Sequence, residues 1–351
     1  MKNIIVLALA GIGDSILATP MIRNLRRIYP ETKITALVIY PIVRDTFQRN
    51  KDIDEVIFFD FLKGGYLKSL MFVLKLRKRR FDLSFLAYPA NRLRHNMISY
   101  LIEARTRIGH IYDIKRIRSL SFLHTKRIPI DENRHCIDEN LKLLEAIGCD
   151  ATKLDKKINF SITKEERSFA ENFLKEHGIL KKDLIIGVHA GSSELAGMAL
   201  KRWPKEKFAD VCDMLVERRK AKILLFGGEN ETRLKEEIIG MMRNKPISVD
   251  NINFFQSAAL IEKCNGFLCN DTGLMHIASI FEIPTVVVTG HTNPKKTRPL
   301  HKLSKVITPK TVCSHYHIGE DLKCLYAGTK DYCLNQIGVE EVYDAIEEVI
   351  R

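Results

Sequence analysis

The stretch GFLCNDTGLMHIASI, residues 266–280, sets a polar turn between two apolar runs. The run before the turn is typical of a buried strand and the run after it of a helix, so we expect the chain to pass directly from one to the other. Backbone N–H groups at the start of such a helix lie at the positive end of its dipole, where a phosphate binds well. Asp271, Thr272, Gly273 and His276 crowd into this turn. The stretch therefore predicts a site for a phosphorylated ligand.

Short apolar runs of the same kind alternate with helix-like segments in both halves of the chain. The predicted strands are 4–9, 34–38, 55–59, 83–87, 184–188, 222–226, 266–269 and 285–288. The predicted helices are 15–27, 66–80, 163–177, 204–219, 231–242 and 339–350. This alternation indicates an α/β fold with parallel sheets covered by helices on both faces.

The length of 351 residues exceeds that of a usual single core and predicts two domains. We expect two Rossmann-like domains, 1–165 and 166–335. The last segment, 336–351, is predicted to be helical and in one interpretation packs back on the first domain. If the two parallel sheets face one another, the carboxyl ends of their strands line a cleft, which is where such folds bind ligands.

The charge of the chain is concentrated in one segment. The net charge is +13, and residues 61–130 contain sixteen Lys or Arg but only three acidic residues, so this segment accounts for the whole excess. It predicts an anionic partner for the N-terminal half. Nucleic acid is a poor match, because the segment shows no recognised reading motif and few interleaved aromatic residues.

The composition favours a soluble protein of a reducing compartment. No apolar run reaches the length of a membrane span. The apolar run 4–10 is at the short limit for a signal peptide and leads directly into a turn, so we expect a cytoplasmic protein. The eight cysteines suggest reduced thiols. Cys313, Cys324 and Cys333 lie near two histidines but without metal-ligand spacing, so no metal site is expected.

Three further polar segments follow predicted strands of the second half. Ser192 and Ser193 lie in a small-residue turn, Lys201 precedes a helix, and Glu229 follows two glycines. The turn and the cation suit a diphosphate, and the carboxylate suits the hydroxyls of a ribose. Each also has a plain structural interpretation: helix capping for the serines and Glu229, a surface charge for Lys201, a core position for His276. Their common place after parallel strands favours a shared ligand site.

The first half has one comparable turn, Gly11-Ile12-Gly13-Asp14-Ser15. Ile16 occupies the third glycine position of the dinucleotide fingerprint, which argues against a nicotinamide-dependent dehydrogenase. Asp14 either caps the following helix or acts as a general base that takes a proton from a hydroxyl nucleophile.

Taken together, these residues resemble glycosyltransferase family 9, the ADP-heptose:lipopolysaccharide heptosyltransferases. The resemblance covers most of the chain. It is carried by the Gly-x-Gly-Asp turn and by four later motifs: Lys201-Arg202-Trp203-Pro204, Phe226-Gly227-Gly228-Glu229, 270–276 and 289–294. It implies the GT-B architecture, with the acceptor bound by the N-terminal domain and the sugar nucleotide by the C-terminal domain. It further implies inverting transfer from ADP-heptose as co-substrate, with no required cofactor or metal.

Carried over residue by residue, the resemblance implies that Asp14 is the catalytic base. The diphosphate would be held by Ser192, Ser193, Lys201, Asp271, Thr272 and Gly273, with His276 supporting the turn, and Glu229 would bind the ribose. Two departures concern the donor pocket: His291 stands where proline is more usual, and the loop 194–200 looks longer. Both leave the transferred sugar open.

The acceptor implied by the resemblance is an anionic glycolipid, the lipid A-Kdo type inner core of lipopolysaccharide. Its acidic groups match the basic segment, and Gly13, Arg92, Arg94, Arg105 and Arg107 are the acceptor contacts we predict. A peripheral place on the cytoplasmic face of the inner membrane follows. The apolar face of the helix near 67–80 suits either lipid headgroups or the core. Alternative functions are a GT-B enzyme with another donor, a nucleotide-sugar epimerase, and a non-catalytic sugar-nucleotide-binding protein.

Overall fold

The computed structural model describes residues 3–112, 119–193, 195–290, 292–310, 329 and 332–350, without the side chains at 195–196. The chain divides into two compact units, Met1–Ser161 and Ile162–Arg351. The boundary expected after residue 165 falls inside a helix, Lys164–Glu176, that packs within the second unit. A capping box sets where this helix begins. The Thr163 side chain accepts from the Glu166 amide, so the helix starts directly after the boundary.

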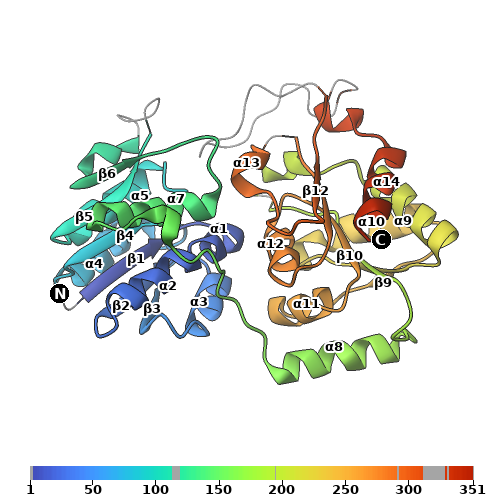
Figure 1. Ribbon diagram of the computed structural model, residues 1–351, viewed down its shortest axis with the longest axis horizontal. Coiled ribbons are helices and arrows are strands. Elements are labelled where there is room, and N and C mark those ends of the chain that lie inside the picture. Colours follow the sequence, from blue (N-terminus) through green and yellow to red (C-terminus); the bar gives the residue numbers. More distant parts are fainter. Residues whose placement is uncertain are drawn as a thin grey trace. The chain divides into compact units, whose positions relative to one another are not determined.

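The first unit alternates strands and helices (Figure 1). Its elements are β1 Asn3–Ala8, α1 Ile12–Leu17, α2 Thr19–Ile28, β2 Lys33–Val38, α3 Pro41–Gln48, β3 Glu55–Phe58, α4 Gly65–Arg77, β4 Leu83–Leu86, α5 Leu93–Ile102, β5 Thr106–Ile111, β6 Lys126–Pro129 and α7 Cys136–Lys142.

The six strands of this unit form one parallel sheet in the order β3-β2-β1-β4-β5-β6. Side chains of β1 alternate between two cores: Ile4 and Val6 pack with α2 and α7, while Ile5 and Leu7 pack with α4 and α5. A strand buried on both faces needs an apolar residue at every position, which explains the unbroken run at 4–9.

The second unit has the same plan (Figure 1). Its elements are α8 Lys164–Glu176, β7 Ile185–His189, α9 Lys205–Arg219, β8 Lys222–Leu225, α10 Thr232–Met241, β9 Ile247–Ser248, α11 Phe254–Ile261, β10 Gly266–Asn270, α12 Gly273–Ile280, β11 Thr285–Val288, α13 Pro294–Thr297, β12 Lys305–Ile307 and α14 Val339–Val349. The strands are parallel in the order β12-β11-β10-β7-β8-β9. Counted from the first strand of each unit, the two sheets have the same order.

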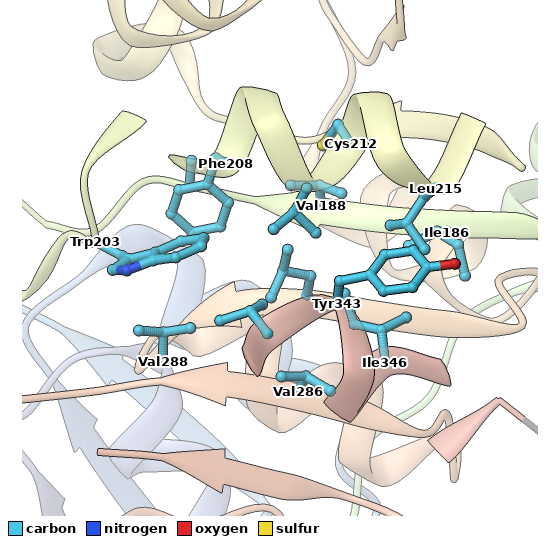
Figure 2. Packing of buried hydrophobic residues seen from close by; sticks show 14 of the residues in the cluster. Ile186, Val188, Trp203, Phe208, Cys212, Leu215, Val286, Val288, Tyr343 and Ile346 are labelled. Atoms are coloured by element: carbon cyan, nitrogen blue, oxygen red, sulfur yellow. The ribbon is translucent and has the colours of Figure 1, made fainter. Parts of the chain in front are cut away.

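One core of the second unit lies between its sheet and the helices α9, α10 and α14 (Figure 2). Trp203 is 1% exposed and packs edge-on against Phe208 with the ring centroids 5.1 Å apart. The apolar face of α14, including Tyr343 and Ile346, is buried in this core against α9 and β11. The helix therefore packs within the second unit, and its predicted contact with the first domain stays a prediction.

The structure differs from the sequence prediction in one helix and several short elements. The helix expected at 15–27 is two helices that meet at Ala18, because Pro20 lies in the first turn of the second and cannot donate a helical hydrogen bond. The elements α3, α5, α7, α11, β5, β6, β9 and β12 were not predicted. Most are short, and a short apolar run does not separate strand from helix.

Candidate functional site

Both sheets reverse their strand order at one point, between β1 and β4 in the first unit and between β7 and β10 in the second. Doubly wound folds bind ligands outside the carboxyl ends of the strands at this switch point. In the second unit the turn 189–193 follows β7 and the turn 271–276 follows β10. The two polar turns that the sequence singles out are thus brought together at the switch point.

A buried asparagine fixes these two turns to each other. Asn270 is 0% exposed, and its side-chain Nδ2 donates to the backbone oxygens of Ala190 at 2.8 Å and Gly191 at 3.3 Å. Its Oδ1 accepts from the Trp203 backbone N–H at 3.0 Å. Asn270 therefore ties the end of β10, the turn after β7 and the start of α9 into one rigid frame. Sequence reasoning quoted this residue as part of the motif without giving it a role.

Lys201 and Asp271 form an ion pair within this frame. Lys201 Nζ lies 3.2 Å from Asp271 Oδ2, and the two side chains are only 17% and 7% exposed. Burial alone would raise the pKa of Asp271, but the charges of Lys201 and His276 outweigh it and hold that pKa below its ordinary value. Asp271 is thus a carboxylate that orients a half-buried ammonium group.

The start of α12 lacks a side-chain cap. Thr272 is the N-cap residue, yet its hydroxyl makes no capping bond and instead lies 3.1 Å from His189 Nδ1. Threonine at this position ordinarily caps the first turn, so its engagement with His189 leaves the amides of that turn available to another acceptor. Uncapped helix amides can donate hydrogen bonds to an anion, and the phosphate site expected from the sequence stays a prediction.

His189 also connects the switch point to the third strand end. Its Nε2 lies 3.0 Å from Glu231 Oε2, which accepts from the Gly228 amide at 2.9 Å as well. Burial alone would raise the pKa of Glu231, but bonding to His189 and Gly228 holds it below its ordinary value. His189 and Glu231 thus join the ends of β7, β8 and β10 in one polar network.

The carboxylate at the switch point is therefore Glu231, while the predicted Glu229 is exposed in a turn of 3-10 helix at 229–231. Glu231 packs directly on Gly191: a Cβ on that glycine would lie 1.8 Å from Glu231 Oε1. The sequence carries no signal that separates the two carboxylates of Glu229-Asn230-Glu231.

The two serines of the turn after β7 differ in burial. Ser192 is buried, and its hydroxyl donates to the Met198 carbonyl at 2.8 Å and accepts from Arg202 Nε at 3.2 Å. Arg202 also donates to the Ser192 carbonyl at 2.6 Å. Ser192 therefore holds the loop in place, and Ser193 next to it is exposed.

His276 and Trp203 complete the surroundings of the turn. His276 lies one turn into α12, is 5% exposed, and contributes to the low pKa of Asp271. Trp203 is a packing residue, and its indole Nε1 donates to the Ile337 carbonyl at 3.3 Å. His291, named as a departure in the donor pocket, lies outside the described residues, as does Glu194 in the loop 194–200.

In the first unit, Asp14 lies after β1 in the first turn of α1, with Gly13 beside it. The side chain is half-buried. Tyr88 follows β4 across the switch point, and its pKa is raised by burial with a further contribution from the charge of Asp14. Asp14 is therefore at the place in its sheet that the polar turns occupy in the second sheet. Tyr88, which the sequence did not single out, lies near it.

The four arginines predicted to contact an acceptor separate into two pairs. Arg92 and Arg94 lie at the start of α5, directly after the carboxyl end of β4, at the same sheet edge as Asp14. Burial and the nearby Arg92 lower the pKa of Arg94. Arg105 and Arg107 lie at the start of β5, at the amino ends of the parallel strands and therefore at the end of the sheet opposite to Asp14.

The surroundings of the second pair explain its place. Arg105 is exposed, and its guanidinium lies 4.0 Å from an Asp82 carboxylate oxygen. Arg107 donates to the carbonyls of Ala104 and Leu123 and lies over the Tyr100 ring. The structure does not bring this pair to Asp14.

The described residues also bear on metal binding and on membrane insertion. Across those ranges, no three His, Cys, Asp or Glu side chains are grouped as metal ligands would be. Cys313 and Cys324 lie outside them, and Cys333 is half-buried. None of the helices described is long and apolar enough to cross a membrane.

Two doubly wound parallel units with polar turns at their switch points have the α/β fold of the GT-B class. Residues 70–323 match the model of glycosyltransferase family 9 (heptosyltransferase). The chain therefore belongs to glycosyltransferase family 9.

Individual relatives agree with this membership. The chain is 24% identical over 311 residues to the lipopolysaccharide core heptosyltransferase OpsX of Haemophilus influenzae, covering 88% of this chain and 84% of OpsX. A family 9 glycosyltransferase structure from Veillonella parvula superposes with a TM-score of 0.80 at 26% identity, covering 99% of this chain and 97% of the other. Escherichia coli heptosyltransferase WaaC with ADP superposes with a TM-score of 0.68 at 16% identity, covering 99% and 97%.

Proposed function

We propose that this chain moves a heptosyl group from ADP-heptose to the inner core of lipopolysaccharide, a lipid A-Kdo type acceptor, with inversion at the anomeric carbon. Family membership supports a heptosyl donor, and the likeness to WaaC with ADP supports an adenine nucleotide. The observation that carries the proposal is the Lys201–Asp271 pair beside the uncapped start of α12.

That arrangement suits a departing diphosphate. The Lys201 ammonium and the amides at the Thr272–Gly273 end of α12 offer positive charge and aligned dipoles, which stabilise the negative charge that develops on the leaving oxygen. We also assign Ser193, which is exposed in the turn after β7, to the diphosphate. With this positive field in place, we propose that the transfer needs no metal, so that a chelator leaves the rate unchanged.

The nucleoside end of the donor is assigned to the β8 side of the switch point. A ribose offers two neighbouring hydroxyls, which a carboxylate accepts well. We propose Glu231 for this contact in place of Glu229, because Glu231 lies in the polar network of the switch point and Glu229 is in solvent. His276 supports the turn from behind.

The acceptor side is assigned to the first unit, with Asp14 as the general base. In the proposed step the acceptor hydroxyl gives its proton to the Asp14 carboxylate while its oxygen bonds to the anomeric carbon. The bond from that carbon to the diphosphate breaks on the opposite side, and its electron pair leaves with ADP. Arg92 and Arg94, crowded at the same edge as Asp14, suit the acidic groups of the acceptor. Because that acceptor is a glycolipid, we place the protein peripherally on the cytoplasmic face of the inner membrane.

A donor panel tests the proposal directly. The protein is incubated with ADP-heptose, ADP-glucose or UDP-N-acetylglucosamine, each with and without a delipidated lipopolysaccharide core, and the products are identified by mass spectrometry. With ADP-heptose and the core together, we expect equal amounts of ADP and heptosylated core. With the other two donors we expect no glycosylated core. Epimerised nucleotide sugar without acceptor, or nucleotide binding without any turnover, would contradict the proposal and identify the epimerase or the binding protein respectively.

A further inference from the structure

Helix α4, Gly65–Arg77, presents an apolar stripe to solvent. Tyr66 is 99% exposed, Leu67 71% and Met71 62%, and Leu70 and Leu74 continue the same side of the helix at 42% and 39%. Their spacing of one, four, five and eight positions places all five on one face of an α-helix. Exposed apolar residues that adjoin one another in this way mark an interaction surface, whereas single ones do not.

The core of the first unit does not need this stripe. The opposite side of α4 supplies Val73 and Leu76, which are buried against β1 and α5. Phe72 stacks on Phe59 with the ring centroids 4.1 Å apart and packs against the same core. The helix is therefore apolar on two faces, one packed and one open. The sequence left two roles for the apolar face of this helix, core packing or contact with lipid headgroups. Core packing accounts for the face of Val73 and Leu76, but it does not account for the open face.

The open face is flanked mainly by cations, although Glu103 pairs with Arg77 near the end of the helix. Residues 61–81 contain seven Lys or Arg and no acidic residue. Lys63, Lys68 and Lys75 are exposed, and no ion pair is described for them within the residues that the structure covers. A stripe of leucine, methionine and tyrosine flanked by lysines has the pattern of a helix that lies in the interface of an anionic membrane.

The direction of α4 suits that place. The helix runs from the carboxyl end of β3 to the amino end of β4, so Tyr66 lies at the sheet edge that also carries Asp14. At the other end of the helix, a hollow of about 540 Å³ is lined by Leu74 and by side chains of both charges, including Lys78, Arg80, Asp82 and Glu103. A bilayer along the open face would therefore lie beside the edge where the proposed acceptor binds.

We propose that α4 lies lengthwise on an anionic phospholipid bilayer, with Tyr66, Leu67, Leu70, Met71 and Leu74 in the interface and the lysines at the headgroups. This rests on the proposed function in one respect, since a glycolipid acceptor gives the enzyme a reason to be at a membrane. A second copy of the chain is a poorer occupant, because a twofold contact through this face would bring the same cations together.

Vesicle binding tests the surface without reference to catalysis. The full-length protein is sedimented with vesicles of phosphatidylcholine, or of phosphatidylcholine mixed with phosphatidylglycerol. We expect binding to the mixed vesicles only, and a fall with added salt. The variant Lys68→Gln/Lys75→Gln should bind roughly 25-fold more weakly, since each lysine near an anionic surface accounts for about a fivefold change. Leu67→Gln/Met71→Gln should reduce binding by at least about tenfold.

Matched controls come from the second unit. Leu180 and Leu303 are 56% and 50% exposed, and Lys181 and Lys182 are exposed, so Leu180→Gln/Leu303→Gln and Lys181→Gln/Lys182→Gln make the same chemical changes away from α4. Both controls should bind vesicles as the wild type does. Equal loss in the controls, no binding by the wild type, or an α4-dependent dimer in place of vesicle binding would overturn the proposal.

Transfer assays separate this proposal from the proposed function. The α4 variants should transfer heptose to a delipidated core at the wild-type rate and lose activity only toward acceptor embedded in vesicles. If the wild type fails to act on the delipidated core, the proposed function is wrong, and the vesicle measurement still decides whether α4 binds the bilayer. If the α4 variants act on embedded acceptor at the wild-type rate, the docking role is wrong while the proposed function stands.

Discussion

Single buried polar side chains hold the strand ends of the second unit in register. Asn270 bonds to the backbone at Ala190, Gly191 and Trp203, and Glu231 bonds to His189 and Gly228. None of these bonds needs a ligand to form. The polar turns are therefore set in position before a donor arrives, which lowers the ordering cost of binding.

Removal of the Asn270 amide should loosen this frame. Asn270→Ala leaves two buried carbonyls and one buried N–H without their partner, at a cost of about 1–3 kcal/mol. Trp203 is the single tryptophan of the chain and lies in the second unit, so its fluorescence reports the unfolding of that unit in denaturant. Asn230→Ala, at an exposed asparagine in the neighbouring turn, is the control and should change the stability by less than about 0.5 kcal/mol. Equal effects of the two variants would contradict the role of Asn270.

The pairing of Glu231 with His189 predicts a pH-dependent stability. The pKa of Glu231 in the folded protein lies below its ordinary value of 4.5, so the carboxylate stabilises the fold fully above pH 4.5 and loses that effect as the pH falls through its folded pKa. The stability difference between wild type and Glu231→Gln should thus be largest near neutral pH and shrink below pH 4.5. A pH-independent difference for Glu231→Gln would refute the pairing.

At this scale the sequence located the polar turn after β10 but not the side chains that hold it, and its role in ligand binding stays a prediction. Asp271, Thr272 and His276 were predictable because polar residues are conspicuous between apolar runs. Asn270, His189 and Glu231 were not, because their partners lie on other strands, as many as 80 residues away for Asn270. The choice of Glu231 over Glu229 depends on which side of a short 3-10 turn faces the sheet, and two carboxylates two positions apart look alike in a sequence.

The polar turns of this chain lie between the ends of strands and the starts of helices. Each strand at a switch point passes into a polar turn, and each turn passes into a helix. The close packing of Glu231 on Gly191 shows how little space separates neighbouring turns. A side chain at Gly191 has no room unless the carboxylate moves.

Gly191→Ala tests whether this packing supports donor binding. The added methyl group would overlap Glu231 and displace it from His189, so we expect the affinity for ADP to fall by about tenfold. The overpacked site should also lose about 1–3 kcal/mol of stability. Calorimetric titration with ADP measures the affinity. Gly228→Ala is the control, because nothing lies within 4 Å of a Cβ at that position. An unchanged affinity in Gly191→Ala would remove Glu231 from the donor site.

Strand elements were easier to predict than helix boundaries. A fully buried parallel strand is an unbroken apolar run, as at Leu83–Leu86 and Thr285–Val288, and such runs were located within a residue or two. Helix α4 shows the opposite case. Its two apolar faces are equivalent in sequence, and only the fold determines that Val73 and Leu76 are packed while Leu67 and Met71 are exposed.

The whole molecule consists of two units with the same strand order. The α/β class and the parallel sheets follow from the alternation of elements, and the structure confirms both. The strand order was beyond the sequence, since it depends on which strands pair across sixty or more residues. That order puts Asp14 at the switch point of one unit and the Lys201–Asp271 pair at the switch point of the other. We therefore assign proton removal to the first unit and stabilisation of the leaving group to the second.

Asp14→Asn tests this division most directly. The transfer rate to a delipidated core and the Kd of ADP are measured on the same preparation, with Asp45→Asn, an exposed carboxylate elsewhere in the first unit, as control. The account predicts that the rate falls by about 10²–10⁴-fold, the usual contribution of a general base, while ADP binds as tightly as to the wild type. Transfer by Asp14→Asn at the wild-type rate would contradict the account.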